Sequence, residues 1–322
     1  MAKAPPRPGR ELLHVSKLNL SSYLSALAIS NAIGYPELSM IKASVPYTDE
    51  QITPPHHHDC LNFWFVLSAP MTHSIAGKRY CLQAGDLFLI PPLLEHSILD
   101  IQKIRTDAYN ACFSDEFVMQ SAGRPVWRKL ISLFYCVPAV QGDAGGPLTL
   151  HFSGRSFDEL SSLVLSIHEI CRRQLAVPEP PQSLYAYARR LFTCLASADA
   201  PLTSEQAQRL SRLEAVICTA LEYLYDHYRE TIRLKDVAES CGLSVSRFSL
   251  LFKTITGMTL MEYANFIRTR RARHLLLHTH RTERSILKEC GFHSDVYFSR
   301  VFKAYTGCPP YIFRREYTII DL

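Results

Sequence analysis

A short pattern occurs twice in the last third of the chain, about 49 residues apart, and it limits this part of the fold to two related helical motifs. The first copy has Gly242 followed by Ser244, and the second has Gly291 followed by Ser294. In each copy the glycine supplies a turn of positive φ, and the serine suits the N-cap of a second helix. Phenylalanines at i and i+4 of that second helix would pack inward and leave its polar positions outward. The pattern therefore predicts a tandem helix-turn-helix.

The segment between the two copies predicts one long helix over residues 259–280, because its apolar residues follow helical spacing. At about 1.5 Å per residue this helix would be roughly 33 Å long. Successive major-groove faces of duplex DNA are roughly 34 Å apart. One chain could therefore read two adjacent turns of a duplex.

The charge distribution favours the same partner. Residues 1–204 contain 17 basic and 17 acidic side chains, whereas residues 205–322 contain 18 and 13, so the net charge of +5 lies in the last third. Within residues 268–315 the ratio is 11 basic to 3 acidic. Arg268, Arg270, Arg271 and Arg273 are clustered there and are predicted to contact DNA phosphates. The alternative for any one of them is a solvated helix face.

From about residue 210 to residue 315 the chain resembles the AraC/XylS family of bacterial transcription regulators. The second motif carries the resemblance, with Gly291-Phe292, Gly307 and Pro309-Pro310 in the family's order and spacing around the run at residues 297–303. Glu283 and Leu287 depart from the family, which usually has an aliphatic residue and an alanine there. The resemblance implies a regulator of transcription, more often an activator, that binds promoter DNA.

Arg300 is the best candidate for a base contact, because a guanidinium can donate two hydrogen bonds to guanine. A phosphate contact is the alternative for this residue. Asp295 would repel phosphate, so we expect it to cap its helix unless it accepts from a cytosine amino group. The first motif is poor in base-reading groups, and its role would be largely positional. Besides the four clustered arginines, the predicted DNA-binding residues are Ser244, Ser246, Arg247, Ser249, Lys253, Ser294, Asp295, Val296, Ser299, Arg300 and Lys303.

The first 155 residues predict short strands with glycine turns, as in a β-barrel or sandwich. An apolar strand is expected at residues 61–67, and a hairpin should turn near Gly77. The order of landmarks resembles a cupin: His56 and His58 in an H-x-H pair, then Gly85 and Pro91, then a further histidine at residue 96. In AraC-type regulators such a domain often precedes the DNA-binding half, where it senses an effector.

The barrel is predicted to bind a small-molecule effector through His56, His58, Asn62, Trp64, Glu95 and His96. Asn62 stands where enzymatic cupins carry a metal-binding glutamate, and its neutral amide is a poor ligand for a divalent ion. We therefore expect no metal and no other cofactor, although three imidazoles could bind zinc. Regular strand parity would direct Trp64 inward, where its ring could stack on a ligand. The alternative is that Trp64 is core and the histidines lie at a solvated rim, and Glu95 could equally be a surface residue.

Two amphipathic helices are expected at residues 157–174 and 183–195, and a third at residues 205–228. The first two could form a homodimer interface or pack on the chain's own barrel. The predicted fold class is a multidomain α+β protein. It has a cupin-like β-barrel at residues 1–155, a helical dimerisation region at 156–204 and an all-α tandem helix-turn-helix domain at 205–322.

Ten cysteines are scattered without a C-x-x-C pair, several of them on apolar stripes, and this favours buried thiols in a cytoplasmic protein. No apolar run is long enough to cross a membrane. The predicted partners are double-stranded promoter DNA, a small-molecule effector, a second copy of the chain and RNA polymerase. No catalysis is expected. Two alternatives stay open: a metal-dependent cupin enzyme fused to a DNA-binding domain, and a ligand-independent regulator whose barrel is an interaction scaffold.

Overall fold

The computed structural model describes residues 34–35, 38–45, 55–68, 70–101, 106–173 and 182–317. These residues divide into two compact units. The larger unit draws its described residues from Ser22–Tyr223 and Arg233–Leu260, and the smaller from Leu224–Ile232 and Met261–Leu322. The division passes through the expected DNA-binding domain, and the boundaries at residues 155 and 204 remain predictions.

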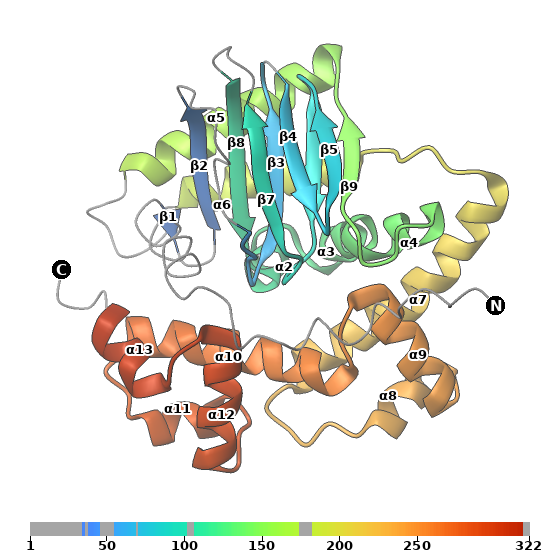
Figure 1. Cartoon of the computed structure of the whole chain (residues 1–322). Coiled ribbons are helices and arrows are strands. Elements are labelled where there is room, and N and C mark those ends of the chain that lie inside the picture. The colour runs from blue at the N-terminus through green and yellow to red at the C-terminus, as the bar shows by residue number, and fades with distance from the viewer. Residues whose placement is uncertain are drawn as a thin grey trace, which may run out of the picture. The chain divides into compact units, whose positions relative to one another are not determined.

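The larger unit is built on two antiparallel sheets, as the spacing of strands and turns predicts (Figure 1). Its six-stranded sheet has the order β1-β2-β8-β3-β6-β9, and its three-stranded sheet has the order β5-β4-β7. The core between the sheets includes Trp64, Phe88 and Ile98. The strands are β1 (Gly34–Tyr35), β2 (Leu38–Val45), β3 (Leu61–Val66), β4 (Met71–Ile75), β5 (Lys78–Leu82), β6 (Asp86–Ile90), β7 (His96–Ile101), β8 (Thr106–Phe113) and β9 (Leu148–His151).

Four helical segments interrupt the strands of this unit, and the expectation of β-structure throughout residues 1–155 was wrong here. Between β8 and β9 lie α2 (Asp115–Ala122), α3 (Arg124–Ile131), the π-helical η2 (Ser132–Cys136) and α4 (Val137–Gln141). The hydroxyl of Ser114 accepts from the amide of Phe117 and caps α2, whose first turn carries Asp115 and Glu116. Capping and acidic residues at an N-terminus stabilise a helix, and these signals are present in the sequence.

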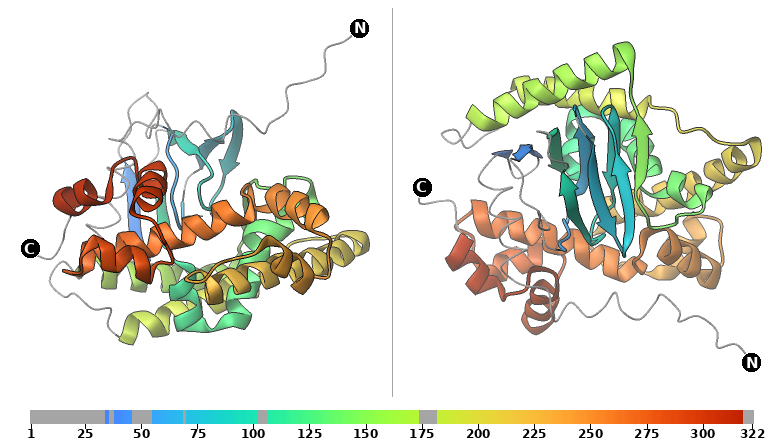
Figure 2. Two further views of the ribbon diagram at one scale, coloured as in Figure 1. Left: turned by 90° about the horizontal axis from the view of Figure 1, so that it is seen from below. Right: turned by 45° about the horizontal axis from the view of Figure 1, so that its top comes forward.

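The two amphipathic helices that follow, α5 (Gly154–Arg173) and α6 (Gln182–Ala196), confirm the helices expected in the middle of the chain. Their apolar stripes lie against the six-stranded sheet of the same chain (Figure 2). The ring of Phe192 lies 4.9 Å from that of Phe113, and the ring of His168 lies 5.2 Å from that of Tyr109. Of the two alternatives for these stripes, packing on the chain's own sheet is the one that the structure shows.

The first helix-turn-helix belongs to the larger unit and consists of α8 (Leu234–Ser240) and α9 (Val245–Thr256). Before it, α7 spans Ser204–His227, which confirms the helix expected there. Gly242 has φ +66°, so the turn of positive φ is present. Ser244 stands at the N-cap position of α9, but its side chain makes no capping hydrogen bond.

The smaller unit holds the second helix-turn-helix, α11 (Glu283–Glu289) and α12 (Asp295–Thr306), with α10 (Leu260–His278) before it and α13 (Pro310–Tyr317) after it. At about 1.5 Å per residue, α10 is roughly 28 Å long, shorter than the expected 33 Å. Gly291 has φ +78°, and a Cβ there would lie 2.6 Å from the carbonyl oxygen of Tyr228. Both the turn and the close approach of the backbone require glycine at this position.

All ten cysteines lie within the described residues, and none forms a disulfide. Of the four cysteines on apolar stripes, Cys171 and Cys218 are buried as predicted, whereas Cys194 and Cys241 are only half-buried. Among the described helices, none has the length and the apolar character that would let it cross a membrane.

Candidate nucleic-acid interface and effector site

The outward face of α9 is exposed as expected, and it contains few groups that can read bases. Ser246, Arg247 and Lys253 are exposed, and Ser249 is half-buried. On the opposite face Phe248 and Phe252 are fully buried, with ring centroids 5.5 Å apart. The i and i+4 phenylalanines therefore set the orientation of this helix.

The outward face of α12 has the same arrangement and is richer in chemistry. Phe298 and Phe302 are buried, whereas Asp295, Arg300 and Lys303 are exposed and Ser299 is half-buried. The Arg300 guanidinium lies 5.3 Å from the centre of the Tyr297 ring, which holds it above the helix surface by a cation–π contact.

The N-cap of α12 is Ser294, whose hydroxyl accepts a hydrogen bond from the amide of Tyr297 at 3.3 Å. The expectation that Asp295 caps this helix was wrong, because Ser294 already occupies the capping position. Asp295 is the first residue of the helix, where its charge still favours the positive end of the helix dipole. Its carboxylate remains exposed.

Two large apolar side chains are exposed on the outward faces of the two helices. Leu250 on α9 is 72% exposed and Val296 on α12 is 80% exposed. Such exposure is unfavourable in water, and isolated apolar groups on a polar face fit the methyl group of thymine in the major groove. Each second helix therefore presents at least one large apolar side chain among polar and basic ones.

The prediction that Arg268 contacts phosphate was wrong. Its side chain is buried, at 6% exposure, because its guanidinium Nε donates to the carbonyl oxygen of Tyr228 at 2.6 Å and a terminal nitrogen donates to that of Glu230 at 2.8 Å. The guanidinium also lies 5.8 Å from the centre of the Phe292 ring. Burial lowers the pKa of Arg268 from its usual value. This residue ties α10 to the segment that follows α7.

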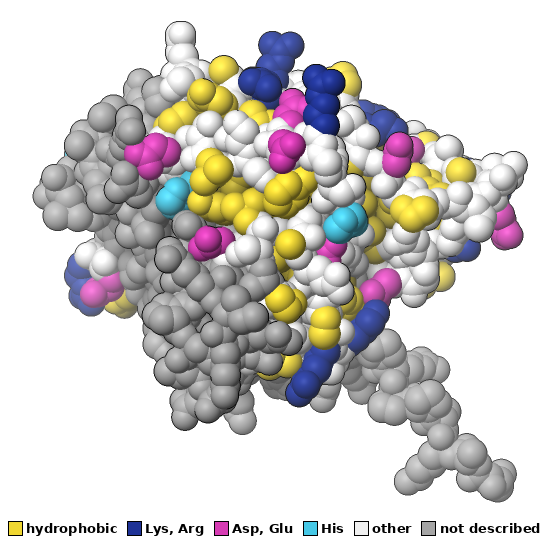
Figure 3. Space-filling model, turned by 90° about the horizontal axis from the view of Figure 1, so that it is seen from above, with side chains coloured by type: hydrophobic (Ala, Val, Ile, Leu, Met, Phe, Trp, Pro, Cys, Tyr) yellow, Lys and Arg dark blue, Asp and Glu magenta, His cyan; other side chains and the backbone are white. Residues whose placement is uncertain are grey.

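The three other arginines of the cluster are half-buried rather than outward on α10. Arg270 donates to the hydroxyl of Tyr225 at 3.2 Å, Arg271 pairs with Glu289 at 3.8 Å, and Arg273 lies over the ring of Phe313. These contacts hold helices of the smaller unit together, and phosphate binding by these three arginines stays a prediction. On the face shown in Figure 3, which is seen from the top of Figure 1, Lys and Arg side chains are scattered.

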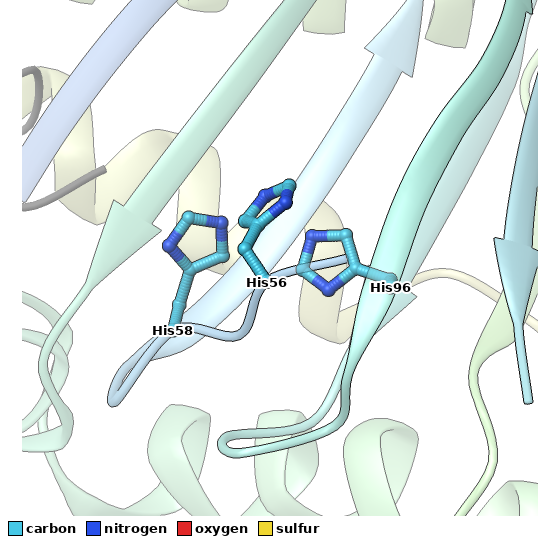
Figure 4. A group of neighbouring side chains, drawn as sticks. All are labelled: His56, His58 and His96. Atoms are coloured by element: carbon cyan, nitrogen blue, oxygen red, sulfur yellow. The ribbon is translucent and has the colours of Figure 1, made fainter. Parts of the chain in front are cut away.

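The three predicted histidines of the barrel come together (Figure 4). The rings of His56 and His96 have centroids 4.4 Å apart, and the ring of His58 lies 5.1 and 5.2 Å from them. Backbone hydrogen bonds of 2.9 and 2.8 Å join His56 and His96, so the segment before β3 is fixed against the start of β7. One nitrogen of each ring lies within 4.8 Å of the others, close enough for the group to hold a metal ion.

A fourth histidine, His73 on β4, extends this cluster into the core. Its ring lies 6.2 Å from that of His96 and 5.2 Å from that of Trp64. Burial, followed by the charge of His56, lowers the pKa of His73 to about 3. Burial also holds the pKa of His96 well below its usual value, so both rings are neutral at pH 7. No local pattern indicates His73 in advance, because it stands alone on a strand and outside the H-x-H pattern.

Several polar atoms at this end of the barrel are buried without a hydrogen-bond partner in the described part of the chain. They are Asn62 Oδ1, Trp64 Nε1, both ring nitrogens of His73, and His96 Nε2. A buried polar atom without a partner costs about 1–3 kcal/mol. Their convergence marks this place as one that accepts polar groups from outside the chain.

Beside the histidines, two cysteines approach His58. Cys112 Sγ on β8, Cys60 Sγ and a ring nitrogen of His58 lie within 4.8 Å of one another. The hydrogen bond from Cys60, and then the charge and hydrogen bond of His58, hold the pKa of Cys112 well below its usual value despite complete burial. The Asn62 amide nitrogen adds a 3.1 Å contact to Cys112 Sγ. Burial alone would lower the pKa of His58, but the neighbouring Cys112 raises it.

Two of the predicted effector residues need correction. Glu95 is exposed in the position just before β7, whereas the next residue, His96, is buried. Trp64 is only 7% exposed and belongs to the core cluster, so its ring is not an open stacking surface. The alternative with Trp64 in the core is therefore confirmed, whereas the solvated rim is wrong for His96, which is 2% exposed.

Comparison with known protein families agrees with this arrangement. A "Helix-turn-helix domain" model matches residues 237–316, and an "AraC-like ligand binding domain" model matches residues 39–99. The HTH-type transcriptional activator RhaS from Klebsiella pneumoniae is 32% identical over 262 residues, covering 80% of this chain and 86% of RhaS. This chain belongs to the AraC family of transcriptional regulators.

Other relatives of this AraC-family chain are more distant. RhaS from an Enterobacter species is 24% identical over 258 residues, covering 80% of this chain and 86% of the relative. The HTH-type transcriptional regulator YisR from Bacillus subtilis is 27% identical over 181 residues, covering 50% and 63%. An apo structure of ToxT from Vibrio cholerae is 12% identical and superposes with a TM-score of 0.46, over 88% of this chain and 99% of ToxT.

Proposed function

We propose that this chain is a transcriptional activator that binds promoter DNA through α9 and α12 and responds to an effector in its β-domain. The observation that carries the DNA-binding part is the outward face of α12. This face exposes Val296 to 80% beside Arg300 and Lys303, whereas Phe298, Val301 and Phe302 on the opposite side of the helix are buried. A helix that is capped, anchored by two phenylalanines and exposed on a mixed apolar and basic face suits the major groove.

Arg300 would contact a guanine and Val296 a thymine methyl group, each on its own base pair. Ser299 and the serines of α9 can contact bases of either type or phosphates. Lys253 and Lys303 occupy corresponding exposed positions near the ends of α9 and α12 and would contact phosphates. Specificity would thus come mainly from α12.

Selection from randomised duplexes tests this assignment. The wild type should enrich a motif, and Arg300→Ala should lose the preference at one position, at a cost of about 1–3 kcal/mol for the preferred base. The matched control Lys303→Ala lies on the same helix face and should weaken binding to all sequences about equally. Uniform loss in both variants would contradict base reading by Arg300.

The effector would bind at the polar end of the barrel. Asn62, His73 and His96 are buried there with polar atoms that lack partners among the described residues. Without a ligand these groups would cost stability, so their presence favours an effector site over a barrel that serves only as a scaffold. The chemistry suits a small polar molecule that accepts from the Trp64 indole N–H and exchanges hydrogen bonds with neutral imidazoles.

A thermal shift screen tests the effector site. A ligand at 100 times its dissociation constant stabilises the protein by about 2.7 kcal/mol. Replacing His73 by phenylalanine should abolish that stabilisation. An unchanged shift in His73→Phe would place the ligand elsewhere.

We also propose that the chain is no enzyme, is cytoplasmic and acts as a homodimer that contacts RNA polymerase. The Asn62 amide nitrogen donates to Asn110 and to the carbonyl of Ala111, so this residue is held as a structural amide rather than as a metal-binding carboxylate. Since the inner stripes of α5 and α6 are used within the chain, the outer face of α5, where Leu165 is 48% exposed, is the surface offered for pairing. Light scattering at micromolar concentration tests the dimer, and a monomer with and without DNA would contradict it.

A further inference from the structure

The pair of cysteines next to the histidine cluster has no part in the function proposed so far. Cys60 lies just before β3, and Cys112 lies on β8, directly opposite Asn62 in the pairing of the two strands. Because Asn62 and Cys112 are opposite each other on antiparallel strands, their side chains lie on the same face of the sheet. Cys60 lies in the bend just before β3, and its thiol approaches that of Cys112. The two thiols, 52 positions apart in sequence, therefore meet at the polar end of the barrel.

We propose that Cys60, Cys112 and His58 form a binding site for a thiophilic metal ion of the zinc class. Their three donor atoms already lie within 4.8 Å of one another. In tetrahedral zinc sites, with Zn–S near 2.3 Å and Zn–N near 2.0–2.1 Å, donor atoms are about 3.3–3.8 Å apart. A contraction of about 1 Å would close the site around the ion.

The surroundings of these three residues suit a bound cation. Asn62 donates to Cys112 Sγ at 3.1 Å. This hydrogen bond would orient a coordinated thiolate and adjust its affinity for the metal, as residues around metal ligands commonly do. Cys112 is buried and Cys60 is half-buried, and their thiolates, the form that binds metals, would balance the charge of the ion. The rings of His56 and His96 lie 5.1 and 5.2 Å from that of His58, so one more imidazole can complete a Cys₂His₂ set.

The donor set selects the ion. Thiolate and imidazole together favour zinc, cadmium or copper(I) over magnesium, calcium or manganese, which prefer oxygen ligands. Binding releases the thiol protons to solvent, and no oxidation or reduction is involved. The inference rests on the proposed function only in that the ion would be sensed by the effector domain, and ion binding itself does not require DNA.

Cobalt(II) titration of the reduced full-length protein tests the site, because cobalt reports thiolate ligands by an absorption band in the near ultraviolet. We expect one equivalent to give this band with the strong visible bands of tetrahedral coordination, and zinc should abolish both. Cys60→Ser and Cys112→Ser should each weaken binding more than about 100-fold, beyond the loss common for residues outside the ligand set. The exposed Cys81, on β5 of the same unit, provides the control Cys81→Ser, which should bind as the wild type does.

Absence of a thiolate band in the wild type would overturn the proposal, and so would a band that survives in both Cys60→Ser and Cys112→Ser. A nitrogen-only cobalt spectrum that is lost in His96→Ala would place the metal on the three histidines and would also overturn it.

Tryptophan fluorescence checks that the variants fold, since Trp64 lies in the same barrel. If Cys112→Ser unfolds, Cys60→Ser is the safer substitution, because Cys60 is only half-buried. DNA binding by the metal-free protein is measured in parallel. If the protein binds DNA but gives no cobalt–thiolate band, the proposed metal site is overturned and the proposed DNA binding is not.

Discussion

Arg268 offers a direct way to separate residues that hold the fold from residues that read DNA. In the structure its guanidinium satisfies the carbonyl oxygens of Tyr228 and Glu230 at 2.6 and 2.8 Å. Arg268→Ala removes both donors, so at least one of these carbonyl oxygens loses its hydrogen-bond partner. A buried polar atom without a partner costs about 1–3 kcal/mol of stability. The variant also loses the contact between the guanidinium and the ring of Phe292. We expect the smaller unit to lose about 2–4 kcal/mol of unfolding free energy.

Urea denaturation of the full chain measures this loss. With a slope of about 1–3 kcal/mol per molar urea, the midpoint of the smaller unit should fall by roughly 1–2 M in far-ultraviolet circular dichroism. Both tryptophans, Trp64 and Trp127, lie in the larger unit, so its fluorescence transition should stay in place as an internal control. Arg268→Lys keeps the charge but loses the planar fork, and we expect it to be destabilised as well.

A phosphate contact of Arg268 would give a different result in both measurements. If Arg268 contacted phosphate, Arg268→Ala would unfold at the wild-type midpoint, and the slope of log affinity against log salt would become shallower by about 0.9. Arg268→Lys would then resemble the wild type in both measurements. Either finding would refute the structural role of this arginine.

Two further predictions concern stability, and both can be measured by denaturant titration. Gly291→Ala should lower the free energy of unfolding by about 1–3 kcal/mol more than Gly242→Ala does. A Cβ at residue 291 would lie 2.6 Å from the carbonyl oxygen of Tyr228, whereas a Cβ at residue 242 would meet no atom within 4 Å. Since φ is positive at both sites, equal losses in the two variants would refute the steric argument. For His73, whose pKa is lowered to about 3, the folded barrel holds the neutral ring while the unfolded chain takes up a proton below about 6.5. Stability is therefore complete above pH 6.5 and declines towards pH 3, by about 2 kcal/mol at pH 5 from this residue alone. Trp64 fluorescence during urea denaturation should show this decline, and it should be smaller by that amount in His73→Phe; an identical decline in the variant would count against the buried neutral histidine.

The repeat in the last third of the chain was sufficient to predict both helix-turn-helix motifs. Local signals determine such motifs: a glycine of positive φ at residues 242 and 291, and phenylalanines four positions apart on each second helix. The histidine cluster was also predictable, because two of its members are neighbours in sequence. The same local signals assigned the outward faces of α9 and α12.

Features that depend on contacts between distant segments could not be read in this way. A run of arginines looks the same whether it meets DNA or, as with Arg268, backbone carbonyls some 40 positions away. Cys60 and Cys112 meet only because β3 pairs with β8, and the single His73 becomes part of the site only because β4 and β7 are neighbours. The helices between β8 and β9 were missed even though Ser114 provides a capping signal.

We expect the exposed face of α12 to read base pairs of a duplex. The most direct test is selection of randomised duplexes by the purified full-length wild type at modest salt, followed by sequencing. We expect enrichment of a defined motif that includes a guanine, and the preference for this guanine should disappear in Arg300→Ala. Recovery of sequences without any enriched motif, at salt concentrations where the chain is folded, would contradict it.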